Sequence, residues 1–220
     1  MTSANRELLE QKVKPALTAF LAQRGLQLSE QKTVLTHIQA GFDFLGHTVR
    51  KDGDKLLISP AKSKVARVRR KIGALIQAAG GLSQEALLRQ LNPLLRGWAN
   101  YYRNGASTRT FAKLDYYVYR QLQRWMHRRH PSQSKAWKQQ KYFTAAGDKG
   151  AFSVRLGSKT GANRVLALYR VASTQIERHL KVRGTANPYD PKDTEYFQKR
   201  RCLAWRVRWS RRTPTTVPAA

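Results

Sequence analysis

LNPLLRGWANYYR, residues 91–103, combines leucines at helical spacing with three aromatic rings and two arginines. If this stretch is a helix, Trp98 and Tyr102 lie one turn apart on the same face, which favours packing of Trp98 in a core. Tyr101 and Arg103 are then the better candidates for exposure. The stretch therefore predicts a helix with one core face and a rim that carries both rings and charge.

Helical signals continue on both sides of this stretch. Ser59-Pro60 predicts the start of a helix, with serine as the N-cap and proline in the first turn. Ser83 is the expected cap of the next helix, and we expect Pro93 to kink or break it because proline removes a backbone hydrogen bond. Apolar spacing then predicts a long helix over 108–129, which Pro131 ends.

The N-terminal quarter of the chain changes period along its length. Apolar spacing predicts a helix over 5–24, followed by Gly25 as its C-cap. Residues 33–38 favour a strand, and Asp52-Gly53 predicts a hairpin turn. We therefore expect a small antiparallel sheet between residues 26 and 58.

After residue 131 the pattern weakens. It predicts a short helix near 136–143, strands near 151–154 and 164–169, and a helix near 194–201. The Pro- and Thr-rich end, 213–220, is expected to be disordered. The predicted fold class is mainly α with a small antiparallel β hairpin or sheet region near the N-terminus (α+β), followed by an irregular C-terminal region.

The charge of the chain is extreme. Its 42 Lys and Arg against 13 Asp and Glu give a formal net charge of +29. Polyanions relieve the self-repulsion of such a chain, and nucleic acid is the best fit because phosphate neutralisation releases counterions. Solubility alone is the alternative, but it needs a far smaller net charge.

Other partners and compartments find little support in the sequence. No apolar run approaches the roughly 20 residues that span a bilayer, and residues 1–6 lack the apolar core of a signal peptide. We therefore expect no membrane partner and a cytoplasmic location. The single cysteine, Cys202, excludes an internal disulfide and a CxxC metal site.

Cations gather in several clusters that are candidates for binding phosphates. For the cations at 62–71, the alternative is a solvated helix face. For the cations at the end of the helix over 108–129, the alternative is an interaction with the helix dipole. The candidate RNA-binding residues are Lys62, Lys64, Arg67, Arg69, Arg70, Lys71, Arg96, Tyr101, Arg103, Lys113, Arg120, Arg124, Arg128, Arg129 and His130. A basic tail adds Lys199, Arg200, Arg201, Arg206, Arg208, Arg211 and Arg212.

The stretch 91–103 resembles the signature of the maturase-specific domain, also called the thumb or X domain, of group II intron reverse transcriptases. Further matches follow in the order of that family, and the resemblance covers roughly residues 7 to 201. They include Arg24-Gly25-Leu26, Gly41–Gly46, Ile58-Ser59-Pro60, Leu114-Asp115, Arg128–Pro131, Lys141-Tyr142-Phe143, Ala186–Pro191 and Glu195-Tyr196-Phe197. The resemblance implies a palm remnant over 1–58, a helical thumb-like bundle over 59–131 and a basic nucleic-acid-binding region over 132–212, before the tail at 213–220.

Two features of that family are missing. Its polymerase needs paired metal ions held by palm aspartates, in part from a Tyr-x-Asp-Asp turn, and no Asp-Asp occurs in this chain. We expect the sequence to begin after that turn, without the fingers and most of the palm. The Cys- and His-rich endonuclease module is absent as well. The chain is therefore expected to have no catalytic residues, no bound metal and no cofactor.

The leading interpretation is an RNA-binding, maturase-like protein that binds group II intron RNA and assists its folding and splicing. One alternative is the thumb and DNA-binding part of a split or truncated RNA-directed DNA polymerase, with DNA as a further target. Another is a general basic nucleic-acid-binding protein. Because the neighbours of the N-terminal sheet are missing, we expect an unpaired edge or apolar patch that docks the absent fingers and palm polypeptide or forms a homodimer.

Overall fold

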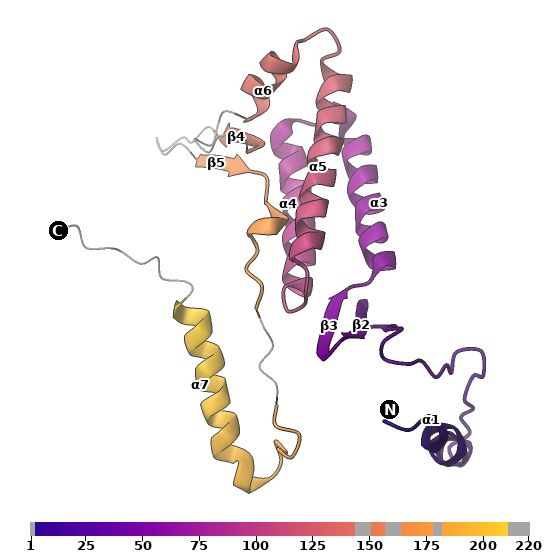
Figure 1. The fold of residues 1–220 in the computed structure, drawn as a ribbon. Coiled ribbons are helices and arrows are strands. Elements are labelled where there is room, and N and C mark those ends of the chain that lie inside the picture. Colours follow the sequence, from indigo (N-terminus) through magenta and orange to yellow (C-terminus); the bar gives the residue numbers. More distant parts are fainter. Residues whose placement is uncertain (1–2, 144–150, 157–163, 178–181, 211–220) are drawn as a thin grey trace, which may run out of the picture. The chain divides into compact units, whose positions relative to one another are not determined.

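The computed structural model describes residues 3–143, 151–156, 164–177 and 182–210. The chain forms two compact units, Met1–Ile176 and Glu177–Ala220 (Figure 1). Helices dominate, and the strands form two small antiparallel sheets, one of them near the N-terminus. The predicted class, mainly α with a small antiparallel sheet, is confirmed.

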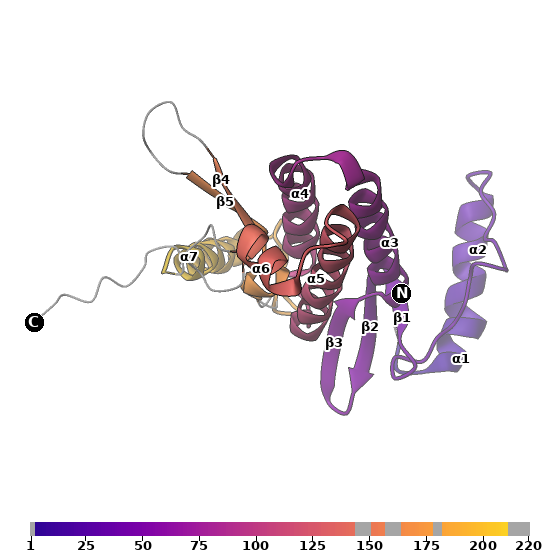
Figure 2. The same cartoon turned by 90° about the horizontal axis from the view of Figure 1, so that it is seen from above.

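Three helices form the centre of the first unit: α3 (Lys62–Ala78), α4 (Gln84–Tyr102) and α5 (Thr108–Arg129). They stand side by side, and α3 and α5 run in the same direction with α4 opposed (Figures 1 and 2). Each helix is amphipathic and buries one stripe, at about 1.5–3 kcal/mol for each large aliphatic side chain. The buried stripes include Val68, Ile72 and Ile76 on α3, Leu87, Leu91 and Leu95 on α4, and Leu114, Val118 and Leu122 on α5.

A smaller layer extends this core. Helix α6 (Lys135–Phe143) and the hairpin of β4 (Ser153–Leu156) with β5 (Arg164–Ala167) add Tyr142, Phe143 and Phe152 to the same cluster. A 3₁₀ turn, Val171–Ser173, follows β5 and buries Val171. The predicted short helix and both predicted strands of this region are thus observed within a few residues.

Helix α4 is continuous through Pro93, so of the two expected effects, a kink or a break, the break does not occur. A proline inside a helix costs about 3 kcal/mol because one hydrogen bond is lost and its ring meets the preceding turn. Leu91 and Leu95 lie on either side of Pro93 and are both fully buried, and their packing outweighs that cost. Ser83 caps the helix as predicted, since its hydroxyl accepts a hydrogen bond from the Ala86 amide at 3.2 Å.

Helix α3 begins later than predicted. Ser59 and Pro60 belong to the last strand of the N-terminal sheet, and the N-cap is Ala61, which makes no side-chain capping bond. These two residues are in a strand rather than a helix because the pairing of β3 with β2 continues to His47 and Pro60. The Ala61 amide then donates to the Gly46 carbonyl at 3.0 Å, which joins strand and helix.

The N-terminal sheet has the order β1 (Phe42–Phe44), β2 (His47–Asp52) and β3 (Lys55–Pro60). Its β2–β3 turn contains Gly53 with φ +56°, which confirms the predicted Asp-Gly hairpin. The strand expected over 33–38 is not formed. That segment shares with the sheet one backbone bond, from the Lys51 amide to the Ile38 carbonyl, rather than a ladder.

The predicted N-terminal helix is observed as three successive pieces: α1 (Arg6–Leu8), a π turn (Leu9–Val13) and α2 (Lys14–Ala22). The wide turn ends two residues before Pro15, whose missing N–H disturbs the regular ladder. Gly25 follows with φ +69°, as expected of a C-cap. None of the residues in these three pieces is buried.

The second unit contains a 3₁₀ turn (Pro191–Asp193) and α7 (Thr194–Ser210). The turn is capped by Asp190, whose carboxylate accepts from the Lys192 amide at 3.0 Å. Helix α7 runs nine residues beyond the predicted end at 201. The expected disordered tail, 213–220, lies outside the described residues.

Candidate nucleic-acid interface

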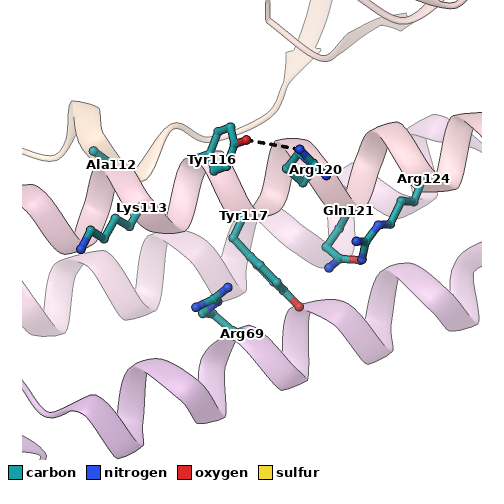
Figure 3. A pocket seen from close by; sticks show the side chains of 8 residues that line it. All are labelled: Arg69, Ala112, Lys113, Tyr116, Tyr117, Arg120, Gln121 and Arg124. Carbon is teal, nitrogen blue, oxygen red and sulfur yellow. Dashed lines mark hydrogen bonds between the residues drawn. The ribbon is translucent and has the colours of Figure 1, made fainter.

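An open groove of about 710 Å³ lies between α3 and α5 (Figure 3). Helix α3 contributes one residue to its lining and α5 contributes seven. Four of the eight are cations and none is acidic, which is the lining expected of a site for phosphates. The lining residues are Arg69, Ala112, Lys113, Tyr116, Tyr117, Arg120, Gln121 and Arg124.

Tyr117 forms the floor of the groove, where the two helices meet. A Cβ atom at Gly73 would lie 2.8 Å from the Tyr117 hydroxyl, so this glycine leaves the space that the hydroxyl needs. The Arg69 guanidinium lies over the Tyr117 ring, 4.5 Å from its centroid. Such a cation–π contact contributes about 0.5–1 kcal/mol at an exposed site. Tyr117 therefore contacts α3 at two places, with its ring against Arg69 and its hydroxyl beside Gly73.

The rim of the groove on α5 alternates charge and ring. Lys113, Tyr116, Arg120 and Arg124 are spaced by three or four residues, so they form one line along the helix surface. Tyr116 is 62% exposed, and its hydroxyl accepts a hydrogen bond from the Arg120 guanidinium at 3.3 Å. The dashed line in Figure 3 marks this bond.

The groove cations are not neutralised by their own helices. Residues 62–78 of α3 contain no Asp or Glu, and α5 contains only Asp115. Both Asp115 oxygens are occupied elsewhere, accepting hydrogen bonds from the Val171 and Ala172 amides at 2.8 Å each. Burial raises the pKa of the Asp115 carboxyl, against the opposing effect of these two amides. Within the described part of the chain, no ion pair involves a groove cation.

The predicted cations of α3 do not form one face. All six are exposed, but only Arg69 enters the groove. At 100° per residue, Arg67 and Arg70 project away from the buried side of α3. The stem of Lys64 lies on the opposite edge, 3.5 Å from where a Cβ at Gly46 would be. Lys62 and Lys71 are exposed as well.

The candidates on α4 make tertiary contacts. The Tyr101 and Tyr102 hydroxyls donate to the carbonyls of Leu45 and Gly46, at 2.7 and 3.2 Å. Both rings also lie against His47. The Arg96 guanidinium lies 5.2 Å from the centroid of the Tyr169 ring. Arg103 is half-buried at the end of α4.

Two candidates at the end of α5, Arg129 and His130, also make tertiary contacts. Arg129 donates to the Leu82 carbonyl and lies over the Trp125 ring, at 5.1 Å from its centroid. The His130 Nε2 atom lies 2.7 Å from the Tyr142 hydroxyl, and its ring packs edge-on against Trp137. Desolvation, with the nearby charges of Lys141, Arg129 and Lys138, lowers the pKa of His130. Arg128 is exposed.

The predicted basic tail is described only in part. Lys199 forms an exposed ion pair with Glu195 at 2.5 Å, and this contact lowers the pKa of the Glu195 carboxyl. Arg201 is exposed, and Arg200 is half-buried. Arg206 and Arg208 lie within α7, of which only the backbone is described there, and Arg211 and Arg212 lie outside the described residues.

Reasoning from the sequence missed the tyrosines and the glutamine of the groove. The signal for Tyr116 was present, since it lies three residues after Lys113 and four before Arg120. The role of Tyr117 was not readable, because it depends on Arg69 and Gly73 from another helix. The sequence also gave no role to Asn92, whose amide donates to the Ala167 carbonyl at 2.9 Å and accepts from the Tyr169 amide at 2.8 Å.

A family model of the group II intron maturase-specific domain matches residues 65–143. This segment is similar to that domain. It spans most of α3, all of α4, α5 and α6, and every residue that lines the groove. The match confirms the resemblance drawn from residues 91–103 and supports a maturase-like function in splicing. No curated protein matches the chain.

The maturase-specific domain is not itself catalytic, and its presence implies association with intron RNA. The groove brings four cations of this domain together at one site. No helix in the described part of the chain is long and apolar enough to cross a membrane.

Proposed function

We propose that the protein binds the structured RNA of a group II intron and helps it reach the fold that splices. The observation that carries this proposal is the groove between α3 and α5, which places Arg69, Lys113, Arg120 and Arg124 together without a carboxylate. Folded RNA brings phosphates close together, and cations from a protein relieve their repulsion by releasing counterions. The protein stabilises the RNA fold, and the RNA carries out the reaction.

The other predicted cations extend this surface in the proposal. Exposed Arg67, Arg70 and Arg128 add attraction for phosphates outside the groove. The tail beginning at Lys199 acts as an electrostatic arm. Arg96 and Arg129 contribute charge near the RNA while they hold the fold together, and His130, whose pKa is lowered, contributes a ring rather than a charge. The domain organisation 1–58, 59–131, 132–212 and 213–220, with no catalytic centre and a cytoplasmic location, belongs to the same proposal.

Competition binding tests the specificity of this function. The full chain is titrated with labelled intron RNA and with an unrelated structured RNA of equal length, in about 0.15 M salt. We expect the intron RNA to bind more than tenfold more tightly, and the intron to splice faster at limiting Mg²⁺ when the protein is added. Equal affinity for both RNAs would leave only a general nucleic-acid-binding protein, and an unchanged splicing rate would contradict the assisting role.

A second candidate function is the thumb and DNA-binding part of a split reverse transcriptase. The observation that favours it is the N-terminal sheet, where the register places Phe42, Phe44, Leu56 and Ile58 on one face. All four are exposed. Of the sixteen large apolar side chains exposed among the described residues, ten precede residue 60, so this surface lacks a cover.

In this second candidate the cover is the polypeptide that carries the fingers and the rest of the palm. The flanking nucleotide sequence provides the test. An upstream reading frame that ends in a Tyr-x-Asp-Asp turn would support a split enzyme with a DNA target, and its absence would leave the maturase function alone.

A further inference from the structure

One aromatic ring of the groove is not used by the fold. Tyr117 is covered by Arg69 and sits on Gly73, but Tyr116 is 62% exposed. Its hydroxyl accepts a hydrogen bond from Arg120, and more than half of the residue's surface stays open to solvent. A large aromatic ring that is open to solvent is a platform for a planar ligand.

The charges beside this ring lie where a nucleotide chain would need them. Lys113 precedes Tyr116 by one turn and Arg120 follows it by one turn, so the two cations are about 10 Å apart along the helix axis. Arg124 continues the same line by another turn. Arg120 donates one of its five N–H groups to Tyr116 and keeps the others for a phosphate.

We infer that the groove receives an unpaired RNA nucleotide, whose base stacks on Tyr116 while Lys113 and Arg120 bind the phosphates on either side of it. The inference rests on the proposed function and narrows its ligand from folded RNA in general to RNA with an extruded or single-stranded base. The volume of about 710 Å³ is in the range of sites that enclose small organic ligands. Sequence-tolerant stacking on aromatic side chains is typical of unpaired bases.

A continuous duplex is the competing occupant. Its bases are stacked on one another, so it offers phosphates to the cations but no free base to Tyr116. The two occupants therefore differ in whether their binding affinity depends on the Tyr116 ring. Removal of the aromatic face weakens binding of an unpaired base, whereas binding of a duplex depends on the cations alone.

Three RNAs and four forms of the full chain separate these cases. The RNAs are a hairpin with a single bulged 2-aminopurine, the same hairpin with an abasic site at the bulge, and a fully paired hairpin. The proteins are the wild type, Tyr116→Leu, Tyr116→Phe, which keeps the ring but loses the Arg120 bond, and Tyr119→Leu. Tyr119 is the matched control because it is exposed on the same helix but does not line the groove. Circular dichroism melting checks that each variant is folded.

The stacking site predicts a specific pattern of affinities. Tyr116→Leu loses about 5- to 30-fold in affinity for the bulged hairpin, the lower part of the range for base–aromatic stacking, and keeps the wild-type affinity for the abasic and paired hairpins. The affinities of Tyr116→Phe and Tyr119→Leu stay within about twofold of the wild-type affinity. A difference of that size is too small for the loss of a stacking contact. The 2-aminopurine fluorescence changes on binding the wild type and Tyr116→Phe but not Tyr116→Leu.

Two results would overturn the inference. If the wild type and Tyr116→Leu bind all three hairpins with the same affinities, the ring receives no base, and the proposed RNA binding stands without it. If the wild type binds none of the hairpins and no intron RNA, the proposed function fails and the stacking site fails with it.

Discussion

Neutralisation of the four groove cations should change how RNA affinity depends on salt. The quadruple variant Arg69→Gln, Lys113→Gln, Arg120→Gln, Arg124→Gln lowers the formal net charge from +29 to 29 − 4 = +25. Each phosphate contact contributes about 0.7 to 0.9 to the slope of log affinity against log salt concentration. Loss of four contacts therefore reduces the slope by about 3. When the salt concentration rises fourfold, the affinity of the wild type therefore falls by a factor roughly 60 times larger than that of the quadruple variant.

A matched control separates the groove from net charge. The variant Lys12→Gln, Lys14→Gln, Lys32→Gln, Lys51→Gln removes the same charge from exposed side chains of the first 58 residues. Fluorescence anisotropy with labelled intron RNA, at salt concentrations from about 0.05 to 0.2 M, gives each slope. We expect the control to keep the wild-type slope within about one contact. Equal losses of slope in both variants would refute the argument, because the whole positive field rather than the groove would then hold the RNA.

Three further predictions concern stability and association. Asn92→Ala should lower the free energy of unfolding in urea by about 1–3 kcal/mol, because it leaves the part-buried Ala167 carbonyl and Tyr169 amide without the Asn92 partner; a change near zero would contradict a stabilising role of these two hydrogen bonds. His130 has a lowered pKa in the fold, so the unfolded chain binds a proton first as the pH falls below about 6.5. Stability should therefore fall between pH 7.5 and 5.5, and His130→Gln should reduce that fall in denaturation curves; an equal fall in the variant would show that other groups cause it. Phe44→Ser with Leu56→Ser should reduce self-association and binding of an apolar dye in light scattering and fluorescence, whereas a wild type that is already monomeric and binds no dye would refute the docking role of the sheet.

The elements that could be predicted from the sequence are those whose signals are local. The hairpin at Asp52-Gly53 depends on a left-handed glycine in the turn, and the helix over 108–129 depends on its apolar period and on Pro131. Both follow from residues next to one another in the chain. The capping role of Ser83 is of the same kind.

Predictions failed where distant contacts outweigh local preference. Pro93 has a strong preference against helix interiors, but Leu91 and Leu95 bury themselves on both sides of it. Ser59 has a strong preference for an N-cap, but pairing of β3 with β2 holds it in a strand. Neither the packing partners nor the strand register is visible in a window of neighbouring residues.

The same limit applies to the candidate interface. The density of cations in the sequence indicated that both helices bind phosphates. The candidates included all four groove cations: Arg69, Lys113, Arg120 and Arg124. It could not say that α3 turns only one of its six candidates towards α5. That outcome depends on the crossing of the two helices at Gly73, where a missing side chain lets Tyr117 approach.

The distinctive stretch 91–103 and the groove have different roles in this domain: the stretch stabilises the fold, and the groove is the proposed RNA-binding site. Within the stretch, Asn92 holds the segment after β5, and the hydroxyls of Tyr101 and Tyr102 hold the turn at Leu45-Gly46. Each of these side chains is committed to a tertiary contact, so a substitution there acts first on the fold. Tyr116 is the same type of residue on a less distinctive segment, but it is 62% exposed. Changes at Tyr116 should therefore alter which RNA is bound without altering stability, whereas changes at Tyr102 should lower stability and affect all RNAs alike.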